Sequence, residues 1–370
     1  MKNIIKTLIV MLTSVSLFGL ANAGEVGVSG TAKATYNIES GGINAGKGLG
    51  ITNELNFTAS GETDAGYTWS YSMELDPGAT QVTGDTDTEG SQSAQNDDTK
   101  LTLSTPYGTV GVFISEGGLD VEDAASQSAY SRPTDMGGSD GVTDNFTIDA
   151  YNNMQYHTPA DLIPFGGSFK IAYAPDLETY GSGNNAGAGH VEGIVDYVGR
   201  SATEMQVSFD AIPMADGLKI GASHFTFDKQ GDEGKKDQEA ESGAYYATYS
   251  IGNVSLGYSK AFRAELINND ANSGASFDAA VDVESYEQTN QSIAYAINDD
   301  LTVSYEKEES KKNFLADQTA DVTQKSTGIQ LAYNLGGMTL AIARNSHDNP
   351  SYSATAADID QTLIAVTMAF

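Results

Sequence analysis

The sequence predicts an all-β protein: a transmembrane antiparallel β-barrel of sixteen strands, with long extracellular loops and short periplasmic turns. Three observations lead to this fold class. Apolar and polar residues alternate in many short segments, the connections between these segments alternate in length, and the last segment runs to the final residue. A barrel rather than an open sheet is expected, because an open sheet would leave backbone groups unpaired in lipid.

The first 23 residues resemble a secretory signal peptide. Lys2 and Lys6 give a basic start, and the run from Ile9 to Leu20 contains no charge. The small residues Ala21 and Ala23 then provide a cleavage site. We expect residues 1–23 to be removed on export and residues 24–370 to form a single barrel domain.

The composition excludes several classes of function. The chain has 50 acidic and 19 basic residues, a net charge of −31, which disfavours nucleic acid as a partner. It has no cysteine, so disulfides and thiolate metal sites are excluded. Its four histidines are scattered without ligand spacing, and no catalytic motif stands out, so neither an enzyme nor a cofactor is expected.

Alternation with a period of two residues defines the strands. In one segment, for example, Trp69, Tyr71 and Met73 share a face, and polar residues such as Ser70 and Ser72 occupy the other. The predicted strands span 25–39, 48–60, 67–76, 99–105, 109–115, 150–158, 168–175, 203–212, 217–227, 243–251, 253–262, 286–297, 301–309, 325–335, 338–346 and 359–370. The segment 186–200 is assigned to a loop, because a further strand there would break the pattern of connections.

The connections and the prolines agree with a barrel. Long acidic segments such as 77–98 and 116–149 alternate with short turns, as in outer-membrane barrels. Every strand of a closed barrel pairs on both sides, which leaves no place for proline inside a strand. All eight prolines lie in predicted loops or turns or at a strand end.

The last strand carries its apolar residues at alternate positions and finishes on an aromatic one. Ile364, Val366, Met368 and Phe370 share a face, with Leu363 on the other. This face is expected to meet lipid, with Phe370 in the aromatic girdle at the turn side.

Four features together resemble the Gram-negative general porins. They are "GEVGVSGTAKATYNI" at the start of the first strand, "LTLSTPYGTVGVF", "NNMQYHTPADLIPFGGSFKIAYAP" and the terminal Phe370. The resemblance implies a homotrimer in outer-membrane lipid, with water-filled pores that pass ions and small hydrophilic solutes by diffusion. It also implies a third loop folded into the lumen and a role for Phe370 as the signal read by the barrel-assembly machinery.

The third long loop is strongly acidic. Folded inward, it would attract cations to a constriction. Its charged residues are Glu116, Asp120, Glu122, Asp123, Arg132, Asp135, Asp140, Asp144 and Asp149. Strand parity adds lumen-wall candidates: Lys33, Lys100, Lys170 and Lys219, with Glu25, Glu54, Glu74, Glu204, Asp210 and Glu306. Unlike many general porins, the chain has no arginine at a clear lumen position in its early strands.

Two alternatives remain open from the sequence. "GDTDTEG" places Asp85, Asp87 and Glu89 at calcium-loop spacing, but Asn96 stands where a bidentate glutamate is expected, so a flexible acidic loop is the preferred interpretation. A secreted or surface β-sandwich adhesin that binds Ca²⁺ through such loops is one alternative. A substrate-selective channel of the same barrel fold is the other.

Overall fold

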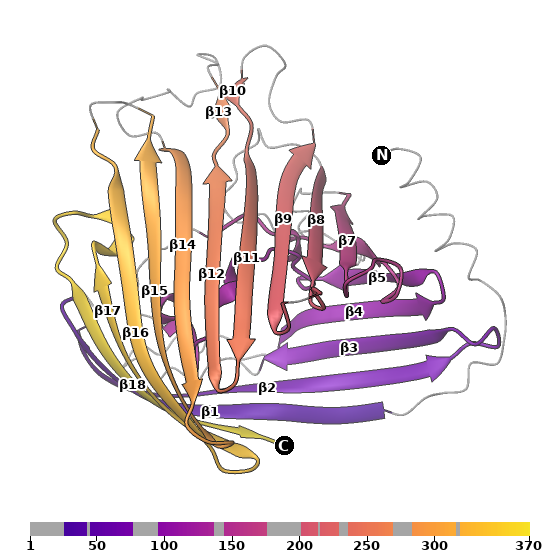
Figure 1. Ribbon diagram of the computed structural model, residues 1–370, viewed down its shortest axis with the longest axis horizontal. Coiled ribbons are helices and arrows are strands. Elements are labelled where there is room, and N and C mark those ends of the chain that lie inside the picture. Colours follow the sequence, from indigo (N-terminus) through magenta and orange to yellow (C-terminus); the bar gives the residue numbers. More distant parts are fainter. Residues whose placement is uncertain are drawn as a thin grey trace, which may run out of the picture.

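The computed structural model describes residues 26–42, 45–76, 95–136, 144–175, 201–213, 215–228, 236–268, 283–315 and 319–370. Sixteen antiparallel strands close into one barrel, in which neighbours in sequence are neighbours in space and β1 pairs with β18 (Figure 1). The predicted fold class is therefore confirmed, and the closed barrel differs from the β-sandwich alternative. No helix in the described parts of the chain is long and apolar enough to cross a membrane.

The barrel strands are β1 (Val26–Ser40), β2 (Gly46–Glu62), β3 (Thr68–Asp76), β4 (Gln95–Thr105), β5 (Gly108–Ile114), β6 (Asn153–His157), β7 (Ser168–Ala174), β8 (Ser201–Phe209), β9 (Leu218–Asp228), β11 (Glu241–Ile251), β12 (Val254–Ala264), β14 (Val283–Ala296), β15 (Leu301–Phe314), β16 (Val322–Asn334), β17 (Met338–Asp348) and β18 (Ile359–Ala369). Four 3₁₀ turns lie in loops: η1 (Asp123–Ala125), η2 (Pro133–Met136), η3 (Ile148–Ala150) and η4 (Pro350–Tyr352).

Each predicted strand matches a barrel strand, but several strands are longer than predicted at the loop side. β15 continues to Phe314, for example, whereas 301–309 was expected. The extension, residues 310–314, carries Lys311 and Lys312 on opposite faces, and the outward Lys311–Asp321 ion pair joins nitrogen and oxygen atoms 2.8 Å apart. Apolar alternation is lost in this extension, so the sequence pattern could not mark its end.

A small second sheet lies within two segments that were predicted to be loops. β10 (Lys236–Gln238) pairs with β13 (Ile267–Asn268). The Gln238 side-chain amide donates to the carbonyls of Glu265 and Glu284, at 2.8 and 2.7 Å. Such short strands carry too few residues for a period-two pattern to be detected. The segments 1–23 and 186–200 lie outside the described residues.

The two faces of the barrel wall differ as the alternation requires. Ile293, Tyr305 and Ile329 lie side by side on the outside and are 43, 43 and 65% exposed. Their sequence neighbours Ser304 and Gln330 point inward and are 5 and 1% exposed. The apolar outside suits lipid, and the inside can hold water or polar groups.

The barrel closes through its last residue. The Phe370 backbone N–H donates to the Gly30 carbonyl at 3.0 Å, and the Gly30 N–H donates to the Phe370 carbonyl at 2.8 Å. The side chain of Phe370 is 69% exposed on the outer face. The terminal residue thus completes the β1–β18 ladder.

Candidate functional site

The third loop, which joins β5 to β6, lies against the inner wall of the barrel. Backbone N–H groups along it donate to inward side chains of one strand after another: Val121 to Ser223 on β9, Gln127 to Ser292 on β14, Ala129 to Ser304 on β15 and Tyr130 to Gln330 on β16, at 2.8–3.1 Å. Farther along, Gln361 on β18 donates to the Met136 carbonyl at 2.8 Å. The loop therefore follows the wall from β8 to β18 inside the ring of strands (Figure 1).

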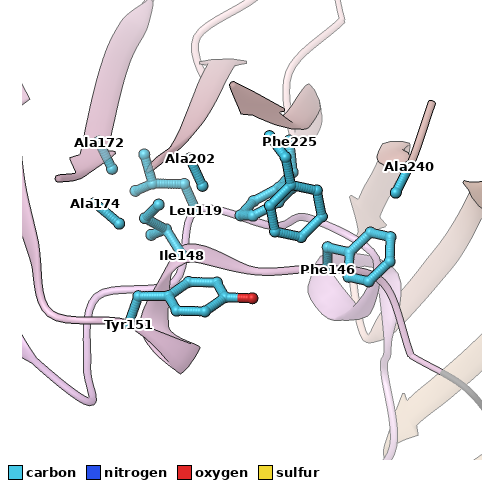
Figure 2. Close-up of a cluster of buried hydrophobic side chains, with 10 residues drawn as sticks. Leu119, Phe146, Ile148, Tyr151, Ala172, Ala174, Ala202, Phe225 and Ala240 are labelled. Atoms are coloured by element: carbon cyan, nitrogen blue, oxygen red, sulfur yellow. The ribbon is translucent and has the colours of Figure 1, made fainter. Parts of the chain in front are cut away.

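An apolar cluster holds both ends of the loop at β7 to β9. Leu119, Phe146 and Ile148 of the loop pack around Phe225 of β9 (Figure 2). Phe227 of β9 belongs to the same cluster. The Phe225 and Phe227 rings meet edge to face, with centroids 4.7 Å apart. Leu119 and Ile148 are 1 and 0% exposed, so this part of the loop is anchored like a protein core.

Buried wall carboxylates hold the loop through hydrogen bonds. Glu204 accepts from the backbone N–H groups of Leu119 and Ile148, at 3.2 and 2.9 Å. Glu306 accepts from the hydroxyls of Ser126 and Ser128. Both glutamates face inward, as their strand parity predicts, but each is 0% exposed because the loop covers it. They anchor the loop and do not line the open pore.

Arg132 forms ion pairs with two exposed acids of the loop. Its guanidinium contacts Asp123, Asp135 at 2.8 Å and Glu308 of β15 at 3.5 Å. The Asp123 and Asp135 side chains remain 59 and 44% exposed. Together with Asp144, these two carboxylates are the exposed acids among the described residues of the loop.

Asp120 and Glu122, in contrast, form hydrogen bonds within the loop and with the wall. Asp120 accepts from the Ser223 hydroxyl at 2.8 Å and from the Glu122 N–H at 3.2 Å. Glu122 is 6% exposed and accepts from the Asn145 N–H at 3.1 Å. Burial raises the pKa of Asp120 and, together with the charges of Asp120 and Asp123, raises the pKa of Glu122 well above its usual value. The loop therefore carries less negative charge near neutral pH than its acid count suggests.

The wall candidates Lys33, Glu54, Glu74, Lys100, Lys170 and Lys219 occupy inward positions of their strands. The structure brings one of them to the loop: Lys100 of β4 forms an ion pair with Glu116. Asp210, expected on a strand, instead follows the end of β8 at Phe209. The chain turns there, and the Ala211 N–H donates to the Phe165 carbonyl. Glu25, Asp85, Asp87, Glu89 and Asp140 lie outside the described residues.

Two residues of the site were missed from the sequence. Glu308 shares an inward face with Glu306 inside the predicted strand 301–309, so strand parity could have found it. Arg263 lies one residue beyond the predicted strand 253–262. It donates to the Asp144 carbonyl at 2.9 Å, and its guanidinium carbon lies 3.9 Å from the Phe146 ring centroid.

A cavity of about 510 Å³ opens beside the loop, toward the turn side of β15–β18. Its lining includes Ser128, Tyr130, Thr302, Asn334 and Thr367 and contains no charged side chain. Hydroxyl and amide groups both donate and accept hydrogen bonds, so this region is suited to water and to hydrophilic solutes.

Comparison with known proteins agrees with this architecture. A family model described as Gram-negative porin matches residues 7–362. The structure is similar to a porin refined at 1.8 Å resolution, at 16% identity over 94% of this chain and 100% of that one, with a TM-score of 0.60. It is also similar to Salmonella typhi OmpF in complex with daunomycin, at 14% identity over 94 and 98% of the two chains, with a TM-score of 0.61.

A third similar structure is a loop L8 deletion mutant of OmpT, an outer-membrane protein of Vibrio cholerae. The identity is 13% over 94% of this chain and 100% of that one, with a TM-score of 0.59. The search of curated proteins found no match. With the family model spanning nearly the whole chain and the closed sixteen-strand barrel observed, the protein belongs to the Gram-negative porin family and is an integral outer-membrane channel protein.

Proposed function

We propose that the protein is a passive, non-enzymatic channel for ions and small hydrophilic solutes, that it prefers cations, and that it works as a homotrimer. The observation that carries the preference for cations is the acidic third loop on the inner wall, with Asp123 and Asp135 open to the lumen. Fixed negative charge in a pore with low-dielectric walls enriches cations. At ~0.15 M salt the Debye length is ~8 Å, so this charge acts across a narrow passage.

The outer face supports association through the first two strands and the last one. Ala34 on β1 lies between Ile51 of β2 and Val366 of β18, and Ala32 and Leu55 continue this face. Ile51 is 61% exposed. These small and aliphatic side chains form a smooth surface for neighbouring protomers, and a trimer would open in conductance steps grouped in threes in a planar bilayer.

Selectivity tests the proposal most directly. We expect the native protein to give a cation-selective reversal potential across a KCl gradient in a planar bilayer. Changing Asp123 and Asp135 together to Asn should lower that potential by roughly a third to a half, because the exposed charge of the loop is removed. Glu241→Gln is a matched control, since Glu241 pairs with His224 on the outer face of the barrel. An anion-selective native pore, or equal potentials in all three proteins, would contradict the proposal.

The same preference should depend on pH. The pKa of Asp123 is raised to about 7 by burial beside the wall and by the charges of Asp135 and Asp144, against the lowering effect of Arg132. Because 59% of the side chain is exposed to screening water, the midpoint should lie at or below this value. Asp144 also has a raised pKa, chiefly because of burial. The loop becomes more negative as pH rises, so cation selectivity should increase between about pH 5 and pH 8.

The stability of the folded protein should change with pH in the opposite direction to the cation selectivity, and should fall as pH rises. A carboxyl whose pKa is raised in the folded state stabilises that state at low pH, and the contribution is lost as pH rises through the folded pKa. Reversal potentials measured at several pH values test the change in charge. A preference that does not vary over this range in the native pore would show that these acids are ionised throughout it.

A further inference from the structure

The cavity of about 510 Å³ beside the third loop has an uncharged lining, among the described residues, in a strongly acidic protein. One side is formed by inward residues at the turn-side ends of four neighbouring strands: Thr302 of β15, Asn334 of β16, Thr339 of β17 and Thr367 of β18. Residues 127–130 of the third loop form the other side. The volume lies within the ~300–1,000 Å³ that is usual for small-molecule sites, so the cavity can hold a solute.

The charged groups nearest to this cavity are not part of its lining. Glu306 is 0% exposed, and its carboxylate is covered by the hydroxyl of Ser128. Lys33 of β1 is the neighbour of Thr367 across the β1–β18 ladder and lies outside the lining. A charged solute would therefore find no opposite charge in the lining to compensate for its lost hydration, whereas a neutral solute needs none.

Several polar atoms of the lining have no hydrogen-bond partner in the described part of the chain. The Asn334 Oδ1 atom accepts from the Thr339 hydroxyl at 2.8 Å, which leaves the Asn334 Nδ2 group to donate. The Gln127 Nε2 group donates to carbonyls of its own loop, which leaves Gln127 Oε1 to accept. The hydroxyl of Tyr130, which can donate and accept, is also free within this part of the structure. The lining therefore offers donors and acceptors together.

The position of Tyr130 is fixed by the wall. Its backbone N–H and that of Ser131 both donate to Gln330 Oε1, at 2.9 and 3.2 Å, and Gln330 Nε2 donates to the Ser131 carbonyl. The Tyr130 side chain is thus held beside the cavity before any solute arrives, which lowers the entropic cost of binding. A tyrosine ring offers a flat apolar face and a polar edge.

We propose that this cavity binds a neutral saccharide, with the sugar ring against Tyr130 and its hydroxyls bonded to Gln127 and Asn334. A saccharide carries hydroxyls that each donate and accept, on a ring with apolar C–H faces, and this matches an uncharged lining with both kinds of polar group. The inference rests on the proposed function as a passive channel, and it names a class of solute that the channel retains. A neutral solute gains nothing from the charges of Asp123 and Asp135, so direct contacts must attract it.

Single-channel currents in a planar bilayer, recorded in KCl with increasing maltose in both chambers, test this subsite. We expect maltose to lower or interrupt the current of the native protein reversibly and with saturation. Glucose should compete with maltose for the cavity. Glucosamine and glucuronate, which place a positive or a negative charge on a similar ring, should compete less well than glucose because the lining lacks a counter-charge.

Two substitutions in the lining and one matched control assign the binding to this cavity. Tyr130→Ala should weaken maltose binding by roughly tenfold, because the ring contact and a hydrogen bond are both lost. Asn334→Leu, at an exposed strand end, removes one donor and should weaken binding by roughly two- to tenfold. Tyr107→Ala removes a tyrosine that is 77% exposed at the β4–β5 turn and does not line the cavity, so it should bind maltose as the native protein does.

The outcomes separate this inference from the proposed function. Equal maltose binding by the native protein and both lining variants would overturn the saccharide site. Tighter binding of glucuronate than of glucose would also overturn it, because Lys33 would then attract the solute in place of the neutral lining. If the native protein conducts ions but maltose leaves its current unchanged, the saccharide site fails and the channel function stands. A protein that opens no channel would contradict the proposed function and this inference with it.

Discussion

Replacing Gly257 by alanine should move the third loop toward the pore axis and lower the single-channel conductance. A Cβ atom at this inward position of β12 would lie 1.7 Å from the carbonyl oxygen of Ala125 in η1, and real contacts of this kind are essentially never under 3.0 Å. The wall therefore must lack a side chain there for the Ser292 hydroxyl to donate to the Ala125 carbonyl at 2.8 Å. Overpacking of this kind typically costs ~1–3 kcal/mol, so the barrel should fold while the loop shifts.

Gly48→Ala is the matched control for this experiment. Gly48 occupies an inward position of β2, and a Cβ atom there meets nothing within 4 Å. The conductance and the reversal potential of the Gly48→Ala variant should equal those of the native pore. If Gly257→Ala also conducts like the native protein, the contact between η1 and β12 does not set the width of the passage.

Removing Phe370 should sharply lower the yield of folded, heat-modifiable protein in the outer membrane. The deletion takes away the two backbone hydrogen bonds to Gly30 that complete the β1–β18 ladder. Each such bond is worth ~0.5–1.5 kcal/mol even in water, and together they correspond to a folding equilibrium constant that is roughly five- to hundredfold smaller. The measurement is the ratio of folded to unfolded bands on gels with and without boiling.

Two substitutions separate the backbone bonds from the side chain. Phe370→Ser keeps the ladder and removes only the ring, so a yield as low as that of the deletion would assign the effect to the aromatic group as an assembly signal. Met368→Ser is the control on the same outward face of β18, where Met368 is 48% exposed. Equal yields for Phe370→Ser and Met368→Ser would mean that the terminal ring carries no special information.

The barrel could be predicted from the sequence because each strand has one face toward lipid and the other toward the aqueous lumen. Between Leu301 and Tyr305, for example, outward apolar residues alternate with inward polar ones, and this contrast identifies the strand. From Lys307 to Asn313 the residues on both faces are polar. The strand continues there through backbone pairing that no side-chain pattern reports. The loop-side boundaries of β14–β17 were therefore misplaced: β14 and β16 begin before their predicted starts, and β15 and β17 continue beyond their predicted ends. The number and order of the barrel strands were correct.

The sequence predicts which residues belong to the candidate site much better than it predicts how these residues are arranged. The sequence shows that the third loop is acidic and that Glu204 and Glu306 face inward. It cannot show that the loop covers these two glutamates, because contacts such as Ser126 with Glu306 join residues 180 positions apart. A count of charges treats Asp120, Glu122 and Asp123 alike. In the structure, Asp120 and Glu122 are buried in the packing of the loop, whereas the Asp123 side chain is exposed to water.

The uneven attachment of the third loop gives the barrel a mechanical asymmetry. The described loop residues join strands from β8 to β18 by hydrogen bonds and apolar packing, so this half of the wall is braced from within. On the other half, the Lys100–Glu116 pair links the loop to β4, and in the described part of the chain the ladders between neighbouring strands hold β1–β3. An isolated protomer should therefore flatten first at β1–β3. In the proposed trimer, neighbouring protomers cover part of this arc, so association would support the stretch of wall that the loop leaves unbraced.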